Sequence, residues 1–335
     1  MKTVVSTPDG VGVEERPDPH APAGGVVLAV HSCGVCGSDL HFVTEPGRRV
    51  GQVLGHELSG TVVEVGADVH GIDVGERFAV NPLGSCGHCA ACRAGLPLRC
   101  EVVPNLGLNA PGGFAQYVAA PAGQLVAIPE GVDTELGAHV EPLSVAIGAI
   151  DLAPSPEGKD ALVFGVGAIG LNVVMALKAR GARTVVAVGR SAGRRAAAAS
   201  VGADAVVDAR EQTIAAYCAE HDLAFDLAYE CSGARDAILD IAPTMKLRGV
   251  IVEVALSFAP TPVDLMRFVS NDLHLVGSCA FDATQFAAAA DLLWSGAIDP
   301  NPLVSERVSI DDAPDAFVRL AHPDDLVGLL VQPWR

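Results

Sequence analysis

A glycine fingerprint in the middle of the chain constrains the fold more than any other feature. Gly165, Gly167 and Gly170 follow the apolar run Ala161–Gly165 and open a helical pattern over Ala168–Arg180. In a strand–turn–helix unit the first glycine makes the turn, the second lets a pyrophosphate approach the backbone, and the third lets the helix pack on the strand. This context predicts a dinucleotide site that includes Gly165, Gly167, Ala168, Ile169 and Gly170.

Short β-branched runs alternate with helical patterns around this fingerprint, which is typical of a parallel sheet covered by helices. The sequence predicts an α/β fold with a doubly wound parallel sheet. Its strands are expected at Ala161–Gly165, Thr184–Val188, Ala205–Val207, Asp226–Glu230, Val250–Val254 and Leu273–Gly277.

The N-terminal part of the chain has a different pattern, because Gly and Pro separate short extended runs such as Gly25–Val30, Ser59–Val65 and Arg77–Val80. A length of 335 residues favours about two domains. The tail is too short to fold alone, so it is expected to pack on the N-terminal part. We expect a β-rich domain from residues 1–143 and 282–335, and a dinucleotide-binding domain over residues 144–281.

The charge of the chain excludes some partners. Its 40 acidic and 22 basic residues give a formal net charge of −18. Such a surface repels phosphate backbones and anionic lipids, so no nucleic-acid or membrane partner is expected. Met1–Gly10 lacks the apolar run of an export signal, and the most apolar stretch, Ala161–Leu177, is explained by the strand and helix of the fingerprint. We therefore expect a cytoplasmic protein.

Clustered cysteines predict a metal site. Cys86, Cys89, Cys92 and Cys100 lie within one short stretch, and His88 inside it is expected to be solvated. Four thiolates close a tetrahedron around Zn²⁺ and leave no open position, which indicates a structural ion. An iron–sulfur cluster and free or disulfide-bonded cysteines are the alternatives.

A second group of metal-ligand residue types is dispersed over Cys36, His56, Glu57 and Glu141. A catalytic zinc needs about three protein ligands and one exchangeable position, which a thiolate, an imidazole and a carboxylate supply. Considered alone, Cys36 and His56 are better explained as packed core residues.

The residues after the second strand of the parallel sheet predict the cofactor. Enzymes that use NAD carry an acid about 20 residues beyond the fingerprint, which binds the adenosine ribose and repels a 2′-phosphate. Here Gly189 holds that place and Arg190 and Ser191 follow, with Arg194 and Arg195 shortly after. Guanidinium groups suit phosphate, so NADP(H) is favoured over NAD(H). The alternative is that these arginines are solvated or stack on adenine in either cofactor.

With these motifs the chain resembles the zinc-dependent medium-chain alcohol and polyol dehydrogenases. The resemblance rests on GVCGSDLH, GHELSGTVVEVG, the four-cysteine loop, GGFAQYV, VEPLSVA, GVGAIG and ECSG, in the family's order and close to its spacings. Glu141-Pro142-Leu143 looks more like the sorbitol, threonine and butanediol dehydrogenase branch. The resemblance implies a GroES-like β-rich catalytic domain and a Rossmann domain.

The resemblance also implies roles for individual residues. Cys36 and His56 match the fixed ligands of the catalytic zinc, whereas Glu57 and Glu141 match positions that ligate it directly or through water, and either carboxylate fits here. Asp39 matches the acid that orients the metal-bound imidazole. Further matches are Ser38 and His41 in the proton relay, and Cys231 and Ser232 of the ECSG motif at the cofactor.

The implied reaction transfers a hydride between a nicotinamide cofactor and a secondary alcohol, diol or polyol, or the corresponding ketone. Ser38 takes the hydroxyl proton, which passes through a ribose hydroxyl and His41 to solvent. About two zinc ions per chain and a homodimer or homotetramer are implied, the subunits pairing at the exposed edge strand Leu273–Gly277. The alternatives are an amino alcohol such as threonine as substrate, or a zinc-free or non-catalytic protein of the same fold. Residues near the zinc loops that are expected at the substrate pocket are Phe42, Leu83, Asn105 and Leu106.

Overall fold

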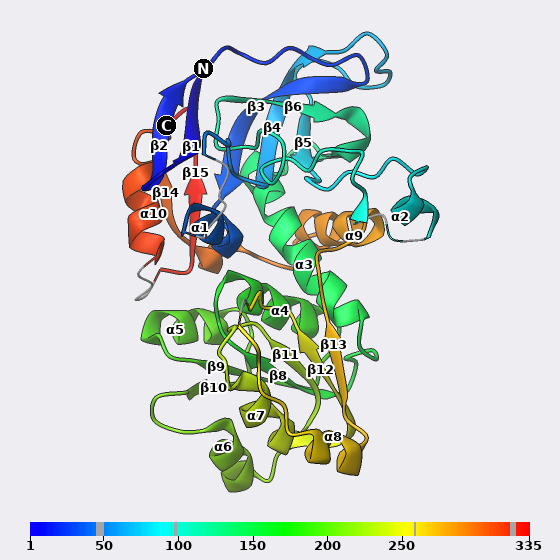
Figure 1. Cartoon of the computed structure of the whole chain (residues 1–335), viewed down its shortest axis with the longest axis vertical. Coiled ribbons are helices and arrows are strands. Elements are labelled where there is room, and N and C mark those ends of the chain that lie inside the picture. The colour runs from blue at the N-terminus through cyan, green and yellow to red at the C-terminus, as the bar shows by residue number, and fades with distance from the viewer. Residues whose placement is uncertain (45–49, 95, 97–98, 258, 322–325) are drawn as a thin grey trace.

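The computed structural model describes residues 1–335 except 45–49, 95, 97–98, 258 and 322–325, and except the side chains of residues 41–44 and 321. Figure 1 shows a β-rich part that contains both termini and, below it, a parallel sheet covered by helices. No helix in the described part of the chain is long and apolar enough to cross a membrane.

A seven-stranded sheet organises the β-rich part, in the order β14-β15-β3-β4-β5-β7 with β6 paired to β3. The C-terminal strand β15 lies beside β3, with Leu330 opposite Gly34, and β14 pairs with β15, so the tail packs on the N-terminal part as predicted. Its strands are β3 (Gly25–Gly34), β4 (Glu57–Val65), β5 (Arg77–Val80), β6 (Tyr117–Pro121), β7 (Leu125–Ala127), β14 (Val304–Val308) and β15 (Gly328–Val331).

Smaller elements surround this sheet. The hairpin of β1 (Lys2–Thr7) and β2 (Gly10–Glu15) forms a separate two-stranded sheet. The helices of this part are α1 (Gly37–Thr44), α2 (Ala90–Arg93), η2 (Ala122–Gln124), η3 (Thr134–His139), α9 (Ala283–Trp294), η5 (Asn301–Leu303) and α10 (Ala313–Ala321).

The second sheet has six parallel strands in the order β10-β9-β8-β11-β12-β13, which confirms the predicted doubly wound sheet. The order reverses between β8 and β11, and ligands of such sheets bind beyond the carboxyl ends of the strands at this switch point. The strands are β8 (Asp160–Phe164), β9 (Thr184–Gly189), β10 (Ala205–Asp208), β11 (Phe225–Glu230), β12 (Met245–Glu253) and β13 (His274–Gly277). Around them lie α4 (Ala168–Ala179), α5 (Ala192–Ser200), α6 (Ile214–His221), α7 (Ala237–Ile241), η4 (Ala242–Thr244) and α8 (Leu265–Asn271).

Helix α3 (Val140–Asp151) connects the two parts and contacts both α4 and α9 (Figure 1). Residues on every side of α3 are buried, including Leu143, Ile147 and Ile150. A helix that is apolar all round is expected to pack on several faces, so α3 fixes the carboxylate of its first turn, Glu141, between the two sheets.

Candidate active site and cofactor site

Three potential metal ligands converge at the ends of β3 and β4. Cys36 lies in the turn between β3 and α1, and His56 and Glu57 stand where β4 begins. One ligand atom from each of Cys36, His56 and Glu57 lies within 4.8 Å of the others. The structure therefore brings together a thiol, an imidazole and a carboxylate, which is a donor set typical of a catalytic zinc.

Asp39 supports this group from behind. It is fully buried, and its Oδ2 accepts a hydrogen bond of 3.0 Å from the backbone N–H of Cys36. Its Oδ1 lies 3.6 Å from Nδ1 of His56, and neither of these buried atoms has a hydrogen-bond partner among the described residues. Asp39 is thus placed to orient the His56 ring so that Nε2 is the ligand atom, as the resemblance implies.

The buried charges at this site fit a bound cation. Burial and the nearby Glu141 raise the pKa of Glu57 well above its usual range, and burial also raises the pKa of Glu141 and of Cys36. Burial alone would lower the pKa of His56, but the Asp39 carboxylate raises it above its usual value. A divalent cation favours the deprotonated ligands, so the donor set fits Zn²⁺.

The two candidate carboxylates differ in position. Glu57 belongs to the compact group with Cys36 and His56, whereas Glu141 lies near it without joining it. The Glu57 side chain lies over Gly34, where an added Cβ would be only 2.1 Å from Oε2. Gly34 and Glu57 are paired across β3 and β4, so the absence of a side chain at residue 34 makes room for this carboxylate.

The other predicted residues of the active site have less defined surroundings. Ser38 is half-buried in α1, two residues after Cys36. The side chains of His41 and Phe42 lie outside the described part of the structure, so the relay role of His41 remains a prediction. Leu83 and Asn105 are half-buried and Leu106 is buried. The side-chain Oδ1 of Asn105 accepts a bond from the backbone N–H of Gly84, which orders the loop before the four cysteines.

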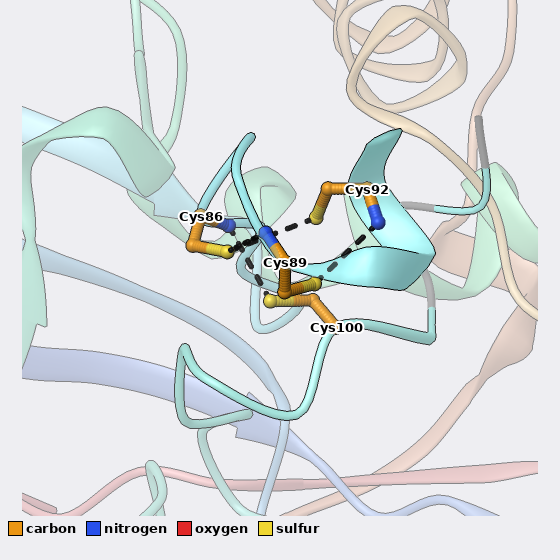
Figure 2. A group of neighbouring side chains, drawn as sticks. All are labelled: Cys86, Cys89, Cys92 and Cys100. Carbon is orange, nitrogen blue, oxygen red and sulfur yellow. Dashed lines mark hydrogen bonds between the residues drawn. The ribbon is translucent and has the colours of Figure 1, made fainter. Parts of the chain in front are cut away.

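The four-cysteine loop converges on one point. Figure 2 shows the sulfur atoms of Cys86, Cys89, Cys92 and Cys100 facing a common centre, and they lie within 4.8 Å of one another. Backbone N–H groups donate to these sulfurs, at 3.2 Å from Cys89 to Cys86 and 3.4 Å from Cys86 to Cys100. The nearby backbone N–H of Val103 lowers the pKa of Cys100, which favours the thiolate. His88 is exposed, as expected. The loop fits a closed Cys₄ zinc site.

The fingerprint glycines are placed as their expected roles require. Gly165 has a φ of +103°, and an added Cβ there would lie 2.6 Å from the backbone nitrogen of Ser232. An added Cβ at Gly170 would lie 1.9 Å from the carbonyl oxygen of Gly165, whereas Gly167 faces open space. The turn therefore leaves an uncovered backbone at the start of α4, next to Ala168 and Ile169, where a pyrophosphate can approach.

Glu230, which the sequence analysis did not single out, holds a loop of the expected cofactor site. It is buried at the end of β11, and its Oε1 accepts hydrogen bonds from the backbone N–H and the hydroxyl of Ser232. Its two oxygens also accept from the N–H of Gly233, at 3.0 and 3.1 Å. Glu230 thus fixes the loop with Cys231 and Ser232 beside Gly165. The quoted ECSG motif contained this signal, because an acid two residues before a serine can accept from that serine.

The structure explains why Gly189 ends β9. An added Cβ at this position would lie 2.2 Å from Cγ2 of Val166, inside the fingerprint turn. The acid that NAD enzymes carry at this place would collide with Val166. Arg190 follows with an exposed side chain, and within the described part of the chain no hydrogen bond or ion pair holds its guanidinium. Ser191 is the N-cap of α5.

The metal-ligand group and the fingerprint helix adjoin each other. Glu57, together with Ala168 and Asn172 of α4, lines one small cavity of about 30 Å³. His139 and Pro142, at the start of α3, line the same cavity. Glu57, one of the candidate zinc ligands, therefore lies beside the helix whose N-terminus faces the expected pyrophosphate.

Comparison with known proteins identifies the family. Residues 22–130 match the alcohol dehydrogenase GroES-like domain, and residues 168–295 match the zinc-binding dehydrogenase domain. These matches confirm the predicted combination of a GroES-like part and a Rossmann-type sheet.

Relatives and solved structures agree with this result. A 2-dehydro-3-deoxy-L-galactonate 5-dehydrogenase from Pseudoalteromonas atlantica is 35% identical over 92% of each chain. A zinc-binding dehydrogenase from Sinorhizobium meliloti bound to NADP has a TM-score of 0.91 at 30% identity over 99% of both chains. An alcohol dehydrogenase from Escherichia coli complexed with NADH has a TM-score of 0.92 at 28% identity, again over 99% of both chains. The chain belongs to the zinc-dependent medium-chain alcohol and polyol dehydrogenases and is an NAD(P)-dependent oxidoreductase of that family.

Proposed function

We propose that the chain transfers a hydride between NADP(H) and a secondary alcohol of a polyol or sugar acid, or the corresponding ketone. The observation that carries this proposal is the position of the Cys36, His56 and Glu57 group, whose member Glu57 lines the same cavity as the helix of the dinucleotide fingerprint. The sugar-acid substrate of the Pseudoalteromonas relative supports a polyhydroxylated substrate. Threonine-like amino alcohols are the second substrate class.

Each residue has a defined task in this proposal. Cys36, His56 and Glu57 would hold the catalytic ion, and Asp39 would orient the His56 ring. When bound, zinc supplies a Lewis acid for the substrate oxygen, and the nicotinamide exchanges the hydride. The Ser38 hydroxyl accepts the proton of the substrate alcohol, and His41 passes a proton to solvent. The loop that Glu230 holds flanks the cofactor on the other side of the fingerprint.

The NADP(H) preference rests on Gly189 and Arg190. Val166 excludes an acid at residue 189, and the exposed Arg190 guanidinium is placed to contact a 2′-phosphate. A charge-assisted contact of roughly 1.5–3 kcal/mol corresponds to about a 10- to 150-fold preference. Replacing Gly189 by Asp, the substitution that the sequence alone suggests for reversing the preference, is a poor test because it would disturb the fingerprint turn. Arg190→Ala is the appropriate substitution.

The assembly and the division of the chain are part of the proposal. β13 is the edge strand of its sheet, and apolar side chains on β13 and the neighbouring α8 are strongly exposed, with Val269 at 76% and Leu275 at 43%. A second copy of the chain, pairing at this edge, would cover them in a cytoplasmic homodimer or homotetramer. The domains would comprise residues 1–143 with 282–335, and residues 144–281.

Metal analysis and kinetics test the proposed function together. The purified protein should contain about two zinc ions per chain, and a panel of secondary alcohols, diols, sugar acids and threonine should be assayed with NADP⁺ and NAD⁺. We expect the highest kcat/KM for a polyhydroxylated substrate with NADP⁺, and loss of turnover in Cys36→Ser. If the zinc-loaded protein is inactive on every member of the panel, the proposed reaction is contradicted. If it is at least as efficient with NAD⁺ as with NADP⁺, the proposed NADP(H) preference is contradicted.

A further inference from the structure

The arginines after β9 do not have equivalent surroundings. The guanidinium of Arg194 donates to the carbonyl oxygen of Leu326 at 2.8 Å, which connects α5 to the C-terminal part of the chain. Arg195 points the other way, and its Nη1 donates to the carbonyl oxygens of Gly189 at 3.2 Å and Arg190 at 2.7 Å. Arg195 therefore binds the backbone of the turn where the adenosine ribose is expected, whereas the Arg190 side chain is exposed.

Asp208 fixes Arg195 in this position. Nη2 of Arg195 lies 2.7 Å from Oδ2 of Asp208, and the two side chains are only 17% and 11% exposed. Asp208 ends β10 and is in register with Gly189 at the end of β9. The ion pair thus joins the carboxyl ends of two adjacent parallel strands. Neither Arg195 nor Asp208 lies near a candidate metal ligand in the sequence.

The ion pair also has an electrostatic consequence. Arg210 and then Arg195 lower the pKa of Asp208, which keeps this group a carboxylate. Nη2 of Arg210 also lies 3.2 Å from Oδ2 of Asp208, so this carboxylate keeps a cationic partner when Arg195 is replaced, and its charge does not select against a 2′-phosphate. Arg195 shares this carboxylate with Arg210, and its Nη1 holds the two carbonyl oxygens of the turn. Nη1 of Arg195 therefore has no N–H group left for the cofactor, and its Nη2 already has a carboxylate partner.

We propose that Arg195, paired with Asp208, is a positioning residue of the cofactor site that shapes the turn at residues 189–190, and that Arg190 alone of these three arginines contacts the 2′-phosphate. The part that concerns Arg190 rests on the proposed use of NADP(H). The part that concerns Arg195 does not, because a turn that holds the adenosine ribose serves both cofactors. Arg195 should thus affect NADPH and NADH to a similar extent, and Arg190 should affect NADPH selectively.

Direct binding measurements on the zinc-loaded full-length protein separate these roles. The dissociation constants of NADPH and NADH would be measured by calorimetry for wild type, Arg190→Ala, Arg195→Ala, Asp208→Ala and the double variant of residues 195 and 208. We expect Arg190→Ala to weaken NADPH by about 10- to 100-fold and NADH by less than about threefold. Arg195→Ala should weaken both cofactors by at least about fivefold, with kcat at saturating cofactor and the zinc content retained. Asp208→Ala should show a similar loss, and the double variant should be no weaker than the single ones.

Matched variants keep the test decisive. Arg180→Ala removes another arginine–aspartate ion pair of the same part of the chain, between Arg180 and Asp151, and should change neither dissociation constant. If Arg195→Ala does not fold, Arg195→Gln is measured in its place, because it retains a donor for the carbonyl oxygens. A selective loss of NADPH in the Arg195 variant would show that Arg195 binds the phosphate, and unchanged binding of both cofactors would also overturn the proposal. A wild type that prefers NADH would refute the NADP(H) preference and leave the Arg195 measurement valid.

Discussion

Replacing Gly34 by Ala should weaken the catalytic zinc site without any change in a metal ligand. The added Cβ would lie 2.1 Å from Oε2 of Glu57, and 3.2 Å from its Cβ and Cδ. Because non-bonded carbon and oxygen atoms need more than 3 Å, the carboxylate must move by about 1 Å. The β3–β4 pairing of Gly34 with Glu57 fixes both backbones, so the Glu57 side chain is the part that yields.

The size of the effect follows from the precision that zinc coordination needs. Ligand distances must fit to within about 0.2 Å, and disturbing the residues that position a ligand costs about 10- to 100-fold in metal affinity. We therefore expect the dissociation constant for zinc at the catalytic site to rise about 10- to 100-fold, equivalent to about 1.4–2.7 kcal/mol. The Cys₄ site should be unaffected, since its ligands belong to a separate loop.

Chelator competition would measure zinc release from each site, and substitution with Co²⁺ would report the ligand geometry by its visible absorption. Gly37→Ala is the matched control, because an added Cβ at this nearby glycine meets nothing within 4 Å. If Gly34→Ala folds and binds zinc as tightly as wild type, Glu57 is not a ligand, and the carboxylate role passes to Glu141. Glu141→Gln would then be the variant that weakens the ion.

Three further predictions concern other parts of the structure. Cys36→Ser should abolish turnover with little change in Tm, whereas Cys89→Ser should lower Tm by removing a ligand of the closed site; equal losses of stability would contradict this division. Gly167→Ala should keep the Tm of the wild type and lose cofactor binding, which a cofactor titration would measure. Gly170→Ala should lower the Tm in a thermal melt, because its Cβ would lie 1.9 Å from a carbonyl oxygen. Burial and Glu230 raise the pKa of Glu253 from 4.5 to about 8, so the stability of the wild type should fall as pH rises through this interval. Glu253→Gln should flatten this fall in Tm, whereas parallel pH profiles of the two proteins would show that Glu253 does not cause it.

Features that depend on local sequence were predictable. Buried parallel strands appear as short apolar runs between glycines, and the strands predicted around Gly165 and Glu230 coincide with β8 and β11 to within about one residue. The start of β12 was predicted five residues too late, at Val250 instead of Met245. In its first residues charged and apolar side chains alternate, Leu247 is exposed, and Arg248 has a φ of +62°, so they lack the continuous apolar pattern of a buried strand. The helix α10 was not among the predicted elements, although Pro314 in its first turn is compatible with the start of a helix.

Features that depend on distant partners were not predictable. The sequence offers Glu57 and Glu141 as equivalent carboxylates, and only the pairing of β4 with β3 places Glu57 beside Cys36 and His56. The same holds for Glu230, whose acceptor role depends on the turn that Ser232 makes. The spacing of motifs in the sequence predicts which residue types reach one end of a sheet. Packing in the folded chain then determines which of several equivalent side chains joins the site.

The arginines after β9 show where this limit affects function. As a sequence, Arg190, Arg194 and Arg195 form one basic cluster that suits a phosphate. In the structure, partners 132 residues away at Leu326 and on the adjacent strand at Asp208 already bond two of them. The positive charge of this cluster therefore does not measure its affinity for the cofactor, because a guanidinium that is paired with a half-buried carboxylate cannot also bind a phosphate without losing its first partner. We therefore expect cofactor preference in this chain to depend on the arginine that the fold leaves unpaired, which is Arg190, because Val166 excludes a side chain at residue 189.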